Sequence, residues 1–210
     1  LNADHQHPLF NPLMQQQLDQ YIQLLIDDQS VKNGNIAICS QNHAVCKSGN
    51  QKIALLAEQI LQRLNCAAII IAEPLHSLPM LLLRRAVADT DCIVPRDSES
   101  RSSLYDIPLI RKTQDQSLLF KLICKALSKR KGCIIEGIGI ISQGALTVEQ
   151  AYIAWSSLLH ATTIKYFEYH LTTGPLLKEE RDAIEQYNNS PLKPLTVDRG
   201  DFCSKPPSPL

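Results

Sequence analysis

Apolar residues recur at helical or strand spacing along most of this 210-residue chain. Helical spacing predicts helices over residues 12–28, 53–64, 75–87, 117–127, 147–170 and 178–187. Short runs of β-branched and other apolar residues predict strands at 36–39, 44–46, 66–72, 92–95, 107–110 and 133–135. The charged, serine-rich residues 96–103 are interpreted as a loop, and the first helix should end near Asn33 and Gly34. This alternation predicts an α/β domain whose sheet is covered by helices on both faces.

The stretch of residues 131–159 combines several of these signals. Three glycines follow its strand and indicate a tight connection around a second apolar run: Gly137, Gly139 and Gly144. Thr147 and Gln150 have the spacing of a capping box, so a helix should begin there. That helix is expected to bury a face made of Ala151, Ala154, Trp155, Leu158 and Leu159.

The same stretch reads Ile138-Gly139, Ile140-Ile141, Gly144 and then T-V-E-Q-A-Y at residues 147–152. It resembles the class II aldolase and adducin-head family, in which His-Gly, an apolar pair and a glycine precede T-L-E-E-A-Y. The resemblance covers most of the chain and implies a three-layer α/β fold with a mixed, mainly antiparallel central sheet covered by helices. The hydrophobic pattern by itself is also compatible with a doubly wound sheet.

The resemblance also shows where the family's metal chemistry is missing. Enzymes of the family bind zinc through an H-x-H pair after a buried strand and through a third histidine before the glycine turn. Here the pair reads Ile71-Ala72-Glu73, and Ile138 replaces the third histidine, so we expect no metal at these positions. The family's catalytic glutamate is matched by Lys52, which cannot transfer a carboxylate's proton without a large pKa shift.

Two further pairs of residues are candidates for phosphate binding. Gly34-Asn35 matches the family's Gly-Asn turn, and Ser48-Gly49 lies where the family carries a small-residue phosphate loop. Their backbone N–H groups and small side chains suit an anion, although the same residues are also ordinary turn formers.

A divergent enzyme would need ligands and a proton donor at new positions. Glu73 and His76 are the weak candidates for a relocated metal pair, with His43 as a third ligand. Tyr187 or Tyr105 would then serve as the proton donor. The alternative interpretation is an exposed carboxylate and a half-buried histidine without a metal.

The composition of the chain excludes some classes of protein. With 21 basic and 21 acidic residues and a pI near 7.1, the chain has no overall attraction to nucleic acid or to an anionic membrane. No apolar run approaches the roughly 18 residues of a membrane span. Seven cysteines without a CxxC pair indicate reduced thiols and a cytoplasmic location.

We divide the chain into a flexible N-terminus (residues 1–8), one domain (9–188) and a proline-rich tail (189–210) that could contact a protein partner.

Two hypotheses of function follow, and a third stays open. The first is a non-catalytic aldolase-like protein that acts as an oligomeric scaffold or interaction module without a cofactor. The second is a divergent zinc-dependent aldolase or epimerase that acts on a small phosphorylated sugar. The third is an unrelated domain that binds a small molecule or nucleotide, which a parallel sheet would favour.

Overall fold

The computed structural model describes residues 12–41, 43–45, 50–85, 91–175 and 177–189. The expected flexible N-terminus, the Ser48-Gly49 pair and all but the first residue of the tail therefore lie outside the described residues. The helices are α1 (Pro12–Asp27), α2 (Gln51–Arg63), α3 (Leu78–Arg85), α4 (Ser98–Leu104), α5 (Gln116–Leu127), α6 (Val148–Thr173) and α7 (Glu179–Asn188). The strands are β1 (Val31–Ser40), β2 (His43–Val45), β3 (Ala68–Pro74), β4 (Cys92–Ile93), β5 (Ile107–Ile110), β6 (Gly132–Ile135) and β7 (Gly139–Gly144).

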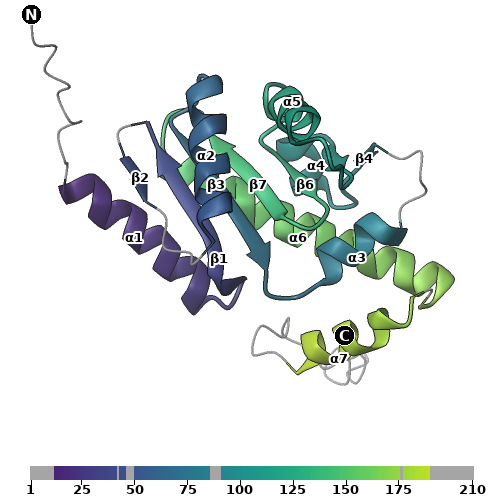
Figure 1. The fold of residues 1–210 in the computed structure, drawn as a ribbon. Helices are drawn as coiled ribbons and strands as arrows, with labels where there is room; N and C mark the ends of the chain where they lie inside the picture. Colours follow the sequence, from purple (N-terminus) through teal and green to yellow (C-terminus); the bar gives the residue numbers. More distant parts are fainter. Residues whose placement is uncertain (1–11, 42, 46–49, 86–90, 176, 190–210) are drawn as a thin grey trace, which may run out of the picture.

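The strands form one twisted sheet in the order β2-β1-β3-β7-β6-β5-β4 (Figure 1). Only β5 and β6 run parallel, and every other neighbouring pair is antiparallel. The mixed, mainly antiparallel sheet expected from the resemblance is therefore confirmed. A parallel, doubly wound sheet is not what this sequence forms.

Helices cover both faces of the sheet and make three layers (Figure 1). Along β3, Ile69 and Ile71 pack with the buried residues of α2 and α5, whereas Ile70 and Ala72 pack with those of α1, α3 and α6. Successive side chains of a strand point to opposite faces, so a central strand covered on both sides must be apolar throughout. This is why residues 66–72 form the clearest run of apolar residues in the sequence.

The stretch of residues 131–159 folds as expected. Thr147 caps α6, and its hydroxyl accepts a hydrogen bond from the Gln150 amide nitrogen at 3.2 Å. The Gln150 side chain accepts from the amide of Leu146, one residue before the capping residue, at 2.9 Å. Trp155 is fully buried and donates to the Ile140 carbonyl at 3.2 Å, which ties α6 to β7 and makes this side chain part of the core.

Two local predictions are wrong. Residues 96–103 are largely helical, because the Asp97 carboxylate accepts from the Ser100 amide at 2.6 Å and so caps α4. Gly34-Asn35 is not a turn at a helix end. It lies within β1, where the register with β3 shifts between Val31 and Ile36 and Gly34 has φ +90°. Such an irregular strand with a left-handed glycine is typical of a β-bulge.

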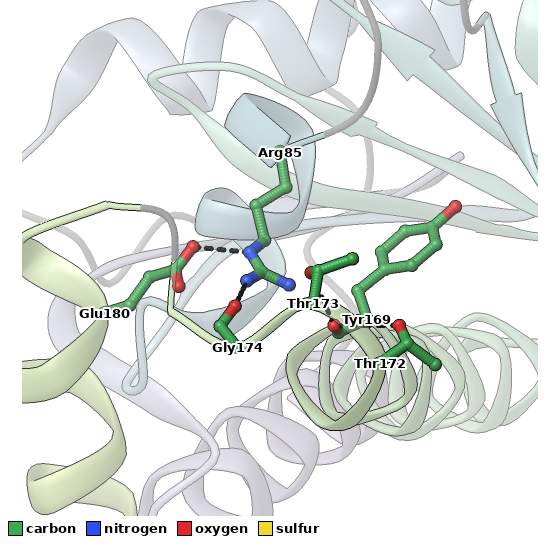
Figure 2. Close-up of polar contacts among 6 residues, drawn as sticks. All are labelled: Arg85, Tyr169, Thr172, Thr173, Gly174 and Glu180. Atoms are coloured by element: carbon green, nitrogen blue, oxygen red, sulfur yellow. Dashed lines mark hydrogen bonds and ion pairs between the residues drawn. The ribbon is translucent and has the colours of Figure 1, made fainter.

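The C-terminal helix α7 is attached to the body through a buried ion pair (Figure 2). Arg85, the last residue of α3, donates to the Glu180 carboxylate at 2.6 Å and to the Gly174 carbonyl. The Arg85 and Glu180 side chains are only 2% and 0% exposed. Beside them lies Tyr166, whose pKa is raised to about 12 by burial and by the Glu180 charge.

Two further findings concern the described residues as a whole. No helix among them is long and apolar enough to cross a membrane. Five cysteines in the described part of the chain are free thiols: Cys39, Cys66, Cys92, Cys124 and Cys133.

Candidate functional site

A cleft of about 710 Å³ opens between the first turns of α2 and α5, next to the connection from β6 to β7. Its polar lining comes from Asn50, Lys52, Gln59, Lys112, Thr113, Gln116 and Glu136. Its apolar lining comes from Ile53, Leu55, Leu56, Leu119 and Ile138. The cleft brings together Lys52 and Ile138, two of the positions that the resemblance singled out.

The three positions that match zinc ligands share one face of the sheet. Ile71 is completely buried among the residues of α2 and α5, and Ile138 packs against the same cluster. Glu73 follows Ile71 by two residues and therefore points to the same face. It also neighbours the β6–β7 connection, since a Cβ built on Gly139 would lie 2.9 Å from the Glu73 Cα.

These residues do not fit a zinc ion. The side chains of Ile71 and Ile138 have no donor atom, and the single carboxylate is already engaged. Lys32 pairs with one oxygen of Glu73, and the Asn35 amide donates to the other at 2.7 Å. An ammonium group thus compensates the carboxylate where a bound cation would otherwise do so. Among the described residues, no group of three His, Cys, Asp or Glu side chains could hold a metal.

Glu73 and His76, the candidates for a relocated metal pair, do not form a metal site either. The carboxylate of Glu73 contacts β1, whereas the ring of His76 packs on Tyr187 of α7, with the ring centroids 5.4 Å apart. Burial lowers the pKa of His76, and its Nε2 atom has no hydrogen-bond partner in the described part of the chain. Burial also raises the pKa of Tyr187. Their contacts suggest packing of α7 rather than proton transfer.

The remaining candidate residues lie in different surroundings. Lys52 is exposed in the first turn of α2 and lines the cleft. Asn35 is near Glu73, but its amide donates to that carboxylate and is not free for an anion. Ser48 and Gly49 lie outside the described residues, and the side chain of His43 is likewise not described. Tyr105 is 68% exposed at the end of α4, where Arg130 lies over its ring at 5.9 Å.

Of the polar residues that line the cleft, the sequence pattern predicted only Lys52, and three of the others lie directly after strands: Lys112, Thr113 and Glu136. They follow β5 and β6, and the Lys112 amide donates to the Glu136 carboxylate at 3.1 Å. Because β5 and β6 run parallel, their carboxyl ends meet at one edge of the sheet, which is where ligand sites of α/β sheets lie. The sequence carries this signal as polar residues directly after two apolar strands.

Comparison with solved structures identifies the fold. L-fuculose-1-phosphate aldolase from Thermus thermophilus matches with a TM-score of 0.61 and 17% identity, over 78% of this chain and 98% of that chain. YgbL from Escherichia coli matches with a TM-score of 0.60 and 9% identity, over 74% and 89%. An aldolase II superfamily protein from Pseudomonas syringae matches with a TM-score of 0.54 and 12% identity, over 81% and 83%. The chain therefore has the fold of the class II aldolases.

Comparisons of the sequence itself give nothing further. No protein-family model matches the chain, and no curated protein matches it. At these low identities the likeness to solved structures establishes the fold alone, and what this chain does must be argued from its own residues.

Proposed function

We propose that this chain is a non-catalytic protein with the class II aldolase fold, which acts as an oligomeric scaffold or protein-interaction module. One observation carries the proposal. At the place where the resemblance implies zinc, Glu73 is held by Lys32 and Asn35, and the other two positions are the aliphatic Ile71 and Ile138. Without a Lewis acid, nothing at these positions could stabilise the enediolate on which the family's reactions depend.

The general base expected from the resemblance is also absent. Lys52 lies in the cleft at that position, and it is exposed. Lysine has no carboxylate with which to accept a proton from a substrate carbon, as the family's catalytic glutamate does. The loss of the ligands and the loss of the base are independent changes, and both support a role without catalysis.

A scaffold role is further supported by surfaces that could bind other proteins. Ile153 of α6 is 54% exposed and lines a second groove of about 590 Å³, and Leu146 just before α6 is 78% exposed. The proline-rich residues 190–210 offer a second type of contact. The five free thiols support a reducing location such as the cytoplasm.

The test is elemental analysis of the purified full chain beside its mass in solution. The proposal expects less than about one zinc per two chains and a mass above that of a monomer. About one zinc per chain would overturn it, because a single catalytic site would then be occupied by ligands that the sequence does not reveal. A metal-free monomer would leave the lack of catalysis standing and reject the oligomeric scaffold.

The cleft beside Lys52 favours a second candidate, the divergent enzyme acting on a small phosphorylated sugar. Lys52 and Lys112 offer two cations to a phosphate there. Thermal shift with sugar phosphates, with and without zinc, distinguishes the two candidates. Binding at 100 times Kd stabilises a protein by about 2.7 kcal/mol, so a ligand would raise the melting temperature measurably. The scaffold proposal expects no shift, with Lys52→Glu as the matched control for any unspecific effect.

A further inference from the structure

The charges of this chain sum to zero but are distributed unevenly. Residues 105–131 carry seven of the 21 basic residues and two of the 21 acidic ones. Three of these lysines are spaced four residues apart: Lys121 and Lys125 lie one turn apart on α5, and Lys129 lies in the turn directly after this helix. All three are exposed, and no ion pair engages them in the part of the chain that the structure describes. We call them the lysine stripe.

A groove of about 480 Å³ runs beside the lysine stripe, between α5 and β5. Its floor is apolar and includes Pro108, Leu122 and Ala126, and Leu122 is 37% exposed. Two of its cations are already engaged, since Arg130 donates to Asp106 at 2.8 Å and Arg111 donates to the Leu83 carbonyl at 2.7 Å. Its exposed cations without such partners are Lys112, Lys125 and Lys129.

The acidic counterpart of this surface is helix α7. Glu179, Asp182 and Glu185 follow one another three residues apart, so each lies beside the next on the surface of the helix, which also carries the exposed Arg181. All three are exposed, and we call them the carboxylate stripe. Glu179 is 58% exposed and meets the exposed Arg84 at 3.4 Å, the kind of surface pair that contributes little energy.

The two stripes cannot meet within one chain. In Figure 1 α5 lies at the top of the molecule and α7 at the bottom, with the sheet and α3 between them. The buried Arg85–Glu180 pair also fixes α7 in its place (Figure 2). A carboxylate stripe that faces the lysine stripe would therefore have to come from another molecule of the same chain.

We propose that α7 of one copy docks against the lysine stripe and the groove beside α5 of the next copy. With a rise of about 1.5 Å per residue, Lys121 and Lys125 lie about 6 Å apart along α5 and the carboxylate stripe spans about 9 Å along α7, so charges of the two helices can face one another. The net charge of zero removes the overall repulsion between copies that would oppose such a contact. The contact is head-to-tail, so repetition closes a ring or extends a filament.

This inference rests on the proposed oligomeric function and names the surfaces that would build it. The experiment is sedimentation velocity on the full chain at several concentrations, in low and in moderate salt. Lys125→Glu and Glu185→Lys each replace an attraction by a repulsion, and the variant with both restores the pair with its charges exchanged. Arg101→Glu, the same change of charge at an exposed residue of α4 that lines neither the groove nor the cleft, is the control. Melting temperatures show whether each variant remains folded.

We expect each single reversal to weaken association by about tenfold or more, the double variant to recover most of the loss, and Arg101→Glu to change little. Association should also weaken as salt shortens the screening length to about 10 Å at 0.1 M. Oligomers that are insensitive to Lys125→Glu, or single losses without recovery, would reject this contact while leaving the scaffold proposal in place. A monomer at every concentration would reject both, whereas bound zinc would reject only the lack of catalysis.

Discussion

Arg85 and Glu180 form the most deeply buried charged contact among the described residues. Their side chains are 2% and 0% exposed, and Arg85 also donates to the Gly174 carbonyl (Figure 2). Removing one member of a buried pair leaves the other charge in a medium that solvates it poorly. The neighbouring pair of Arg84 and Glu179 is about half exposed, at 48% and 58%, so water can replace either partner.

We therefore predict that Arg85→Ala lowers the free energy of unfolding by about 3–5 kcal/mol. Arg84→Ala, one residue earlier on the same helix, should lower it by no more than about 1 kcal/mol. Urea denaturation followed by circular dichroism measures both. Equal effects of the two substitutions would mean that the Arg85–Glu180 pair is open to solvent in the protein.

A second prediction concerns His76, whose pKa is lowered from 6.5 by burial. The folded protein then binds fewer protons at this residue than the unfolded chain does, so stability rises with pH in this window. As pH falls below 6.5, His76 should cost up to about 1.36 kcal/mol per pH unit until the lowered folded pKa is reached.

The measurement is urea denaturation of the wild-type protein and of His76→Gln between about pH 7 and pH 5.5, where carboxylates contribute little. The variant keeps a polar side chain against Tyr187 but does not titrate. We expect its stability to depend less on pH than that of the wild type. The same slope in both proteins would contradict the assignment.

At the scale of elements, the connection between β6 and β7 depends on two glycines with different constraints. Gly137 has φ +79° and open space around its Cα, whereas Gly139 has φ +132° and lies against β3. A Cβ on Gly139 would approach the Ala72 carbonyl oxygen to 2.3 Å. The close approach of β7 to β3 at this point therefore requires a residue without a side chain.

We predict that Gly139→Ala destabilises the protein by about 3 kcal/mol or more, because backbone strain and a clash with β3 add together. Gly137→Ala, which adds strain alone, should cost about 1 kcal/mol. Urea denaturation of the two variants side by side separates the contributions. A cost for Gly137→Ala as large as that for Gly139→Ala would contradict the close packing of β7 on β3.

Most elements could be predicted because their hydrophobic pattern agrees with their burial. The run at residues 66–72 became a central strand, and the face of Ala151, Ala154, Trp155 and Leu158 became the buried face of α6. The two wrong predictions concern segments whose structure depends on local contacts rather than on the spacing of apolar residues. Helix α4 has few apolar residues and depends on its Asp97 cap, and Gly34 has the composition of a turn but lies in a bulged strand.

At the scale of the whole molecule, the order of elements was enough to predict a sheet covered by helices on both faces, since layers follow from which faces are apolar. That the sheet is mixed and mainly antiparallel came from the family resemblance. The candidate site was predicted only in part. Ile71 and Ile138 were singled out by the same resemblance. The pairing of Glu73 with Lys32 and Asn35 could not, because it joins side chains 41 and 38 residues apart in the sequence. Contacts between distant strands depend on the register of the sheet, which the sequence pattern does not specify.

The shared fold and the proposed equivalence of residues 71, 73 and 138 with zinc ligands lead to a last prediction. Ile71, Glu73 and Ile138 share one face, so histidines at these three positions should converge on one point. We expect the variant Ile71→His, Glu73→His, Ile138→His to bind about one zinc per chain, as a site with three protein ligands does. Ile138→His alone should bind none above the wild-type level, because two of the three donors are still missing.

Elemental analysis after dialysis measures the zinc, and circular dichroism shows whether each variant is folded. Zinc should also raise the melting temperature of the triple variant and leave that of Ile138→His unchanged, because only a ligand that binds the folded state stabilises it. A folded triple variant without zinc would mean that the three positions do not converge, and the equivalence with the enzymes' ligands would then be wrong. Zinc binding by the variant would show that the backbone at these three positions already has the geometry of a zinc site. Only the side chains would then differ.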